Sequence, residues 1–264
     1  MPAPHLSLRI AAAVPGVWHA DALGAGPQRV QPTGYAPLDE QLPGGGWPVG
    51  ALSEVLQLRA GLHEWQLVLP ALAQALAARP GVAVAVAPPC EPFGPALQAR
   101  GLDAGRLCRV RPAAGAAAAL WAAEQALRCR DVLAVMAWLP QAQPAALRRL
   151  QMAAAQRQQL LWVFRPDRSA PLASPALLRL QVQPGEGAEG LRVRILKRRG
   201  PPLAQALELP GCHPRLAQML AAQAERRRAA QQDASDWLAA RAAVSVVPPG
   251  RAHALDRAAM APAR

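Results

Sequence analysis

The residues best placed to do chemistry lie in the stretch QLRAGLHEW, which follows the glycine cluster of Gly44–Gly46 and an apolar run, Ala51–Leu58. A turn with Gly61 comes next, and a helical pattern begins near Glu64. This order of strand, turn and helix is typical of phosphate binding, because loop N–H groups and a helix N-terminus attract anions. The candidate nucleotide-loop residues are Gln57, Arg59, Gly61, His63 and Glu64.

The loop lacks the groups with which a phosphate-binding loop holds its ligand. The pattern GxxxxGK[ST] supplies a lysine for the β and γ phosphates and a hydroxyl for magnesium. After Gly61 the sequence has Leu62, His63 and Glu64 instead, and the one lysine of the chain is Lys197. A carboxylate beside phosphate oxygens repels them. We therefore expect a degenerate loop with no nucleotide, no other cofactor and no metal.

The end of the central apolar run departs from a nucleotide hydrolase in a second way. Such enzymes place an acidic residue near the metal at the end of this strand. The run Asp131–Pro140 has its only acid, Asp131, at the beginning, and it ends in Met136, Ala137 and Trp138. The two departures are independent, and together they predict that the chain is not an enzyme.

Cysteines and histidines provide no alternative site. The four cysteines form no CxxC pair, and the five histidines form no HExxH motif. A zinc site is therefore not expected, and the cysteines are interpreted as thiols of a cytoplasmic protein. The N-terminal apolar stretch is short and broken by Pro15 and Gly16, which argues against a secretory signal.

Positive charge is the strongest compositional signal. Lys and Arg number 29 against 17 Asp and Glu, which gives the 264 residues a net charge of +12. Such an excess favours an anionic partner, either nucleic acid or an acidic protein face, although a merely solvated basic surface is the alternative. The candidate contact residues are Arg194, Lys197, Arg198, Arg199, Arg226, Arg227, Arg228 and Trp237.

The elements that would position these residues alternate between apolar runs and helical patterns up to Pro166. This alternation predicts an α/β fold with a mostly parallel sheet and helices on both faces. Three further runs predict antiparallel strands at the C-terminal edge: Ala176–Gln183, Gly190–Lys197 and Leu203–Leu209. We expect an irregular arm over 1–29, a core domain over 30–210, and a basic helical tail over 211–264 that ends in a disordered segment.

Several segments match a known family in sequence order. They are VQPTGYAPLDEQLPGGGWPVGALSEVL, VAPPCEPFGPAL, ALWAAEQALR, VLAVMAWLP, ALRRLQMAA, LLWVFRP, SPALLRLQV and GLRVRILKRRGPPLAQALEL. Over roughly Val14 to Leu209 the chain resembles the ImuA family of translesion DNA synthesis-associated proteins, which is related to RecA and SulA. The resemblance implies a RecA-like core and a cytoplasmic role in SOS mutagenesis, the error-prone part of the DNA damage response.

The resemblance also implies partners. These are an ImuB-type protein related to Y-family polymerases, an error-prone DnaE-type polymerase and RecA, with direct contact to DNA as a weaker expectation. Three alternatives stay open: a RecA-like ATPase with an unorthodox loop, a binder of single-stranded DNA, and a SulA-like division inhibitor that contacts FtsZ. Glu91 falls near the position of a RecA-type catalytic glutamate, but without a nucleotide site it receives no such role.

Overall fold

The structure is a computed structural model. It describes residues 28–113, 115–186, 190–201, 203, 205–211, 226, 228–229, 231–232, 234–235 and 237. The chain divides into two units, 1–213 and 214–264, and each is described by itself. Most of the predicted arm and of the predicted tail lies outside the described residues, so both stay predictions.

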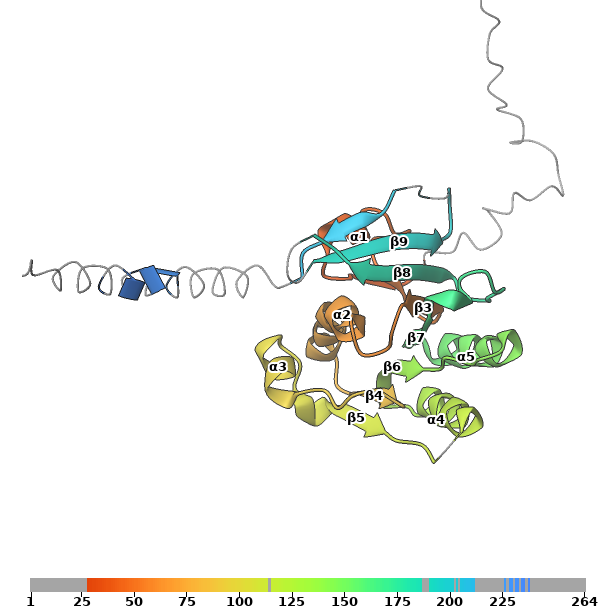
Figure 1. Ribbon diagram of the computed structural model, residues 1–264. Coiled ribbons are helices and arrows are strands. Elements are labelled where there is room, and N and C mark those ends of the chain that lie inside the picture. The colour runs from red at the N-terminus through yellow and green to blue at the C-terminus, as the bar shows by residue number, and fades with distance from the viewer. Residues whose placement is uncertain are drawn as a thin grey trace, which may run out of the picture. The chain divides into compact units, whose positions relative to one another are not determined.

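An eight-stranded sheet forms the first unit, in the order β10-β9-β8-β3-β7-β6-β4-β5 (Figure 1). The strands from β8 to β5 are parallel, whereas β9 is antiparallel to β8 and β10 is antiparallel to β9. The strands are β3 (Leu52–Gln57), β4 (Val82–Val86), β5 (Leu107–Val110), β6 (Val132–Trp138), β7 (Leu160–Pro166), β8 (Leu178–Pro184), β9 (Leu191–Lys197) and β10 (Leu207–Leu209). This confirms the predicted α/β fold, which is consistent with a RecA-like core. The last predicted strand, Leu203–Leu209, is shorter than expected.

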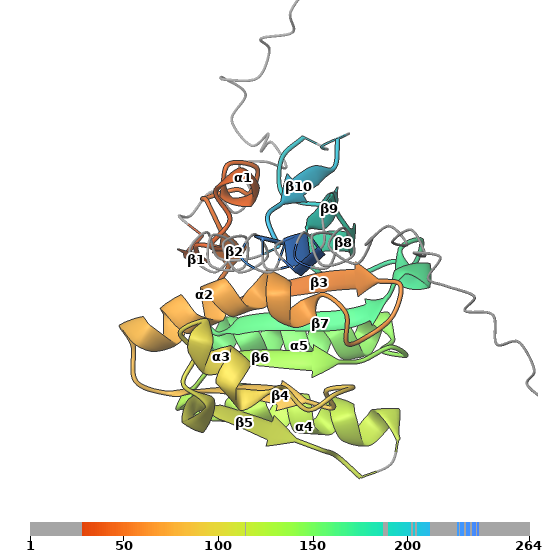
Figure 2. The same cartoon turned by 60° about the vertical axis from the view of Figure 1, so that its left-hand side comes forward.

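Helices cover both faces of the sheet (Figures 1 and 2). On one face lie α2 (Glu64–Ala78) and α3 (Gly94–Ala99), and on the other lie α4 (Ala116–Arg128) and α5 (Pro144–Arg157). Because side chains alternate along a strand, β7 sends Trp162 into the core under α2 and Val163 into the core under α4 and α5. Burial on both faces explains why β4 and β6 are wholly apolar.

Short elements complete the first unit. The helix α1 (Ala36–Asp39) and the paired strands β1 (Val30–Gln31) and β2 (Trp47–Pro48) occupy the turn-rich region, and two 3-10 turns are η1 (Ala104–Arg106) and η2 (Asp167–Ser169). The ring of Trp47 in β2 is fully buried and meets Trp162 edge-on, with the ring centroids 5.7 Å apart.

A hydrogen bond from another segment replaces the one that the proline inside α2 cannot make. Pro70 has no N–H, so the carbonyl of Gln66 one turn earlier loses its helical partner. The hydroxyl of Tyr35 donates to that carbonyl at 2.7 Å. Gly34 has φ +87° and lies so close to the Pro70 ring that a Cβ there would come within 2.4 Å of it. The segment before α1 is thereby fixed against α2.

A buried ionic cluster joins three central strands on the face of the sheet opposite α2. The carboxylate of Glu54 in β3 is 2.6 Å from Arg165 Nη1 in β7 and 2.5 Å from Arg179 Nε in β8. All three side chains are nearly or fully buried. Arg179 also donates to the carbonyls of Ser169 and Ala170, at 3.0 and 3.1 Å, which ties the η2 turn to the sheet.

Candidate functional site

The candidate nucleotide loop joins the end of β3 to the start of α2, at the carboxyl edge of the parallel strands, where α/β proteins usually bind ligands. Glu64 is the first residue of α2, and it is only 1% exposed. Its Oε1 accepts from the N–H of Gly61 at 2.6 Å, and its Oε2 accepts from the N–H of His63 at 3.1 Å. The carboxylate therefore takes up donors that would otherwise face an anion.

Trp138 supplies a third donor to the same carboxylate. Its indole Nε1 lies 2.7 Å from Glu64 Oε1, and both side chains are buried. Trp138 is the last residue of β6, the position at which the sequence lacks the hydrolase acid. Its ring also packs on Phe164 and Trp65, with centroid distances of 4.6 and 6.1 Å. The two departures from a nucleotide site therefore meet in one interaction and are not independent, contrary to the expectation from the sequence.

The other loop residues do not converge on a ligand. Arg59 is exposed. The Gln57 amide is buried at the end of β3, and within the described part of the chain neither its oxygen nor its nitrogen has a hydrogen-bond partner. The Nε2 of His63 is likewise buried without a partner among the described residues. Burial lowers the pKa of His63 from its ordinary value of 6.5, and the nearby Glu64 carboxylate opposes this effect.

These residues do not fit a bound triphosphate. Two N–H groups of the loop donate inward to Glu64, and no lysine lies in the loop. Lys197 is at the end of β9, where its ammonium group donates to the carbonyl of Ser174 at 3.1 Å. The sequence suggested that Glu64 acts by repelling phosphate. The geometry adds a second cause, which is that its carboxylate occupies the donors.

Glu91 lies in the segment between β4 and α3. Its side chain is 64% exposed, and its carboxylate forms ion pairs with Arg109 and Arg111, the second at 3.4 Å. These two arginines come from β5 and the residue that follows it. The glutamate is therefore held by the edge strand of the sheet.

The basic edge is formed by β9 and the residues after it. Leu191, Val193 and Ile195 are buried, while Arg192 and Arg194 are exposed, which confirms the predicted alternation. Arg192 pairs with Glu208 of β10, and this hydrogen bond raises the pKa of Arg192 and lowers the pKa of Glu208.

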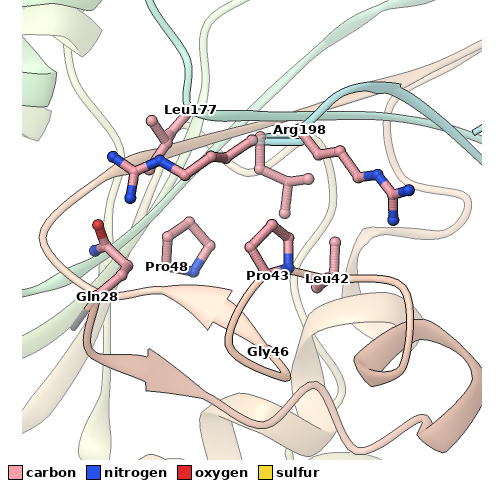
Figure 3. Close-up of a pocket in the computed structure, with 9 residues that line it drawn as sticks. Gln28, Leu42, Pro43, Gly46, Pro48, Leu177 and Arg198 are labelled. Carbon is pink, nitrogen blue, oxygen red and sulfur yellow. The ribbon is translucent and has the colours of Figure 1, made fainter. Parts of the chain in front are cut away.

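The predicted cluster around Arg198 is partly engaged within the protein. Its guanidinium donates to the carbonyl of Pro201 at 2.9 Å and to that of Gln41. Figure 3 shows Arg198 with Pro43 and Pro48 around a cavity of about 30 Å³, which has room for about one water molecule. Lys197 and Arg199 are exposed, so the basic surface is mainly that of Arg194, Lys197 and Arg199.

The second unit holds the remaining contact candidates. Arg226, Arg228 and Trp237 lie in helical backbone and are exposed, whereas Arg227 lies outside the described residues. The interpretation of this cluster as a contact surface or as a solvated helix face therefore stays a prediction.

Neither a metal cluster nor a membrane helix is found in the part of the chain that the structure describes. No three of its His, Cys, Asp and Glu side chains come together as metal ligands would. None of its helices combines the length and apolarity needed to cross a bilayer. Comparison with known proteins found no family model and no curated protein that matches the chain.

Proposed function

We propose that this protein is a non-catalytic accessory factor of error-prone translesion DNA synthesis, with a RecA-like core that acts through protein contacts. The partners in this proposal are an ImuB-type subunit, an error-prone DnaE-type polymerase and RecA. The proposal combines the sequence resemblance to the ImuA family with the chemistry of the loop before α2. A scaffold can inherit a fold without retaining its catalytic site.

One observation carries the non-catalytic part of the proposal. The carboxylate of Glu64 accepts from Gly61, His63 and Trp138, so the loop is satisfied by the protein's own anion. A phosphate group would have to displace a buried carboxylate and leave it beside its own negative charge. Both steps are unfavourable, because charges without partners are costly in a low-dielectric site.

Calorimetry tests this part directly. The purified full chain is titrated with ATP and magnesium, and we expect no binding and no hydrolysis. Micromolar binding that is lost in His63→Ala would instead support a RecA-like ATPase. In a host that lacks the chain, wild type and His63→Ala should restore damage-induced mutagenesis equally, because the loop has no catalytic part.

The basic edge is the surface that we propose for anionic contacts. Arg194→Glu combined with Arg199→Glu should weaken association with the ImuB-type partner or with single-stranded DNA. Arg148→Glu with Arg157→Glu on α5 is the matched control, since these two arginines are also exposed. Fluorescence anisotropy over a salt series separates the partners, because DNA affinity falls steeply as salt rises. If wild type and both double variants bind equally, this surface is not the site of anionic contacts.

A further inference from the structure

An open hollow lies beside the loop, on the α2 and α3 face of the sheet. Its volume is about 360 Å³, and its walls come from the start of α2, from the segment after β4 and from α3. The apolar residues that line it include Leu62, Trp65, Leu69, Pro92, Phe93 and Leu97. It is thus a mostly apolar depression at the carboxyl edge of the sheet, where a nucleotide-binding relative would hold its ligand.

Large apolar side chains are exposed around this hollow. Phe93 is 70% exposed and Leu62 is 44% exposed, and both line it. Leu58, in the same loop as Leu62, is 72% exposed. Exposed aliphatic and aromatic groups that gather at one concave place are typical of a protein-binding surface, whereas single exposed residues are ordinary.

The charge around the hollow is positive. Glu91 lines the hollow and is already engaged, because it pairs with arginines of the β5 segment. Glu64, at the start of α2, accepts from the N–H groups of Gly61 and His63. Arg100 lines the hollow, and Arg59 is exposed in the same loop as Leu62. Neither of these arginines forms an ion pair within the described residues. An acidic occupant would therefore be complementary to the rim.

We propose that this hollow binds an acidic segment of a partner protein through one aliphatic or aromatic anchor side chain. The anchor would lie between Leu62 and Phe93, and carboxylates beside it would pair with Arg59 and Arg100. This inference rests on the proposed function, because it names the contact surface of an accessory protein. Residues 212–264 of the chain are a poor alternative occupant, since they carry more arginines than acidic residues.

Synthetic peptides test the proposal on the full-length protein. The probe is a fluorescent peptide of Asp, Glu and Ser with one central Phe or Leu, and its affinity is measured by anisotropy. The matched peptides replace the central residue by Ala, or every acid by Lys. We expect the Ala peptide to bind at least fivefold more weakly than the Phe or Leu peptide. The Lys peptide should show no saturable binding.

Protein variants locate the site. Phe93→Ala should weaken binding of the acidic Phe peptide at least tenfold, and Arg100→Gln should weaken it at least threefold. Trp121→Ala is the matched control, because Trp121 is 64% exposed on α4 across the sheet. Arg148→Gln on α5 is the control for the charge. Both controls should bind as wild type does.

Three outcomes would overturn the proposal. The first is equal binding of the Phe and Ala peptides, or no saturable binding by either. The second is an equal loss of peptide affinity in Phe93→Ala and Trp121→Ala. The third is a wild-type dimer in sedimentation that Phe93→Ala makes monomeric, because the occupant is then a second copy. None of these outcomes affects the nucleotide calorimetry or the complementation assay, so this inference can fail while the proposed function stands.

Discussion

Glu54 and Glu64 are both buried carboxylates of one strand–loop–helix unit, but different groups neutralise them. Glu54, in the middle of β3, contacts the guanidinium groups of Arg165 and Arg179. Among the described residues, Glu64, at the start of α2, accepts from neutral N–H groups alone, two of the backbone and one of Trp138. The first arrangement uses full charges from neighbouring strands, and the second uses the dipoles of two loop N–H groups and one indole N–H group.

The difference separates a carboxylate neutralised by full charges from one held by neutral N–H dipoles. Strand register alone brings the Glu54 partners together, because Glu54 is paired with Arg179 directly and with Val163, close to Arg165. Two donors of Glu64 lie in the loop before α2 and the third is Trp138 at the end of β6, all at the carboxyl edge of the parallel strands. The same residue type therefore joins strands of the sheet in one place and satisfies loop and indole N–H groups in the other.

The largest effect is expected for Glu54→Gln. Removal of the carboxylate leaves two buried guanidinium groups without their counter-charge, which costs about 3–5 kcal/mol when one partner of a buried pair is lost. The free energy of unfolding from urea denaturation measures this change. The combination Glu54→Leu, Arg165→Met and Arg179→Met removes all three charges, and it should recover most of the loss. A small loss in Glu54→Gln would show that the cluster is accessible to water.

Glu64→Gln should cost less, about 1.5–3 kcal/mol, the range for hydrogen bonds to a charged group. The amide keeps one acceptor oxygen but turns an NH₂ group toward donors. Urea denaturation again gives the value. A double-mutant cycle with Trp138→Phe should show coupling, because both changes remove the same hydrogen bond. Strict additivity would mean that Trp138 and Glu64 do not interact.

Tyr35→Phe provides the fully neutral reference, with an expected loss of about 0.5–1.5 kcal/mol for one uncharged hydrogen bond. In a Pro70→Ala background the N–H of residue 70 can donate to the Gln66 carbonyl. The same Tyr35→Phe change should then cost less. An equal cost in both backgrounds would assign the effect to lost packing of the Tyr35 hydroxyl.

The smallest effect concerns His63 and pH. Burial lowers the pKa of His63 below 6.5, so the unfolded chain binds a proton there more readily than the folded chain does. Stability that depends on neutral His63 is therefore present above pH 6.5, and it is lost as the pH falls below this value. As the pH falls from 7.5 to 5.5, the melting temperature of wild type should therefore fall more than that of His63→Gln. Thermal melts at each pH measure this difference. A constant difference would contradict the lowered pKa.

The helix and strand pattern could be predicted from the sequence because it depends on local periodicity. The run of β6 is a continuous apolar stretch, and β9 alternates arginine with valine and isoleucine. The observed ends of both strands therefore lie within two residues of the predicted ends. The edge strand β10 was predicted too long, and β1 and β2 were missed, because such short strands have little periodicity of their own.

The sequence by itself determined the α/β class, the antiparallel C-terminal edge and the absence of a lysine and hydroxyl from the loop, since residue type and spacing suffice for these. Only the tertiary structure decided that Glu64 turns inward to meet Trp138, that Glu54 joins two arginines, and that Arg198 is engaged by Gln41. These contacts join residues far apart in the chain. Their geometry follows from the order and register of the strands, which no local pattern of residues encodes.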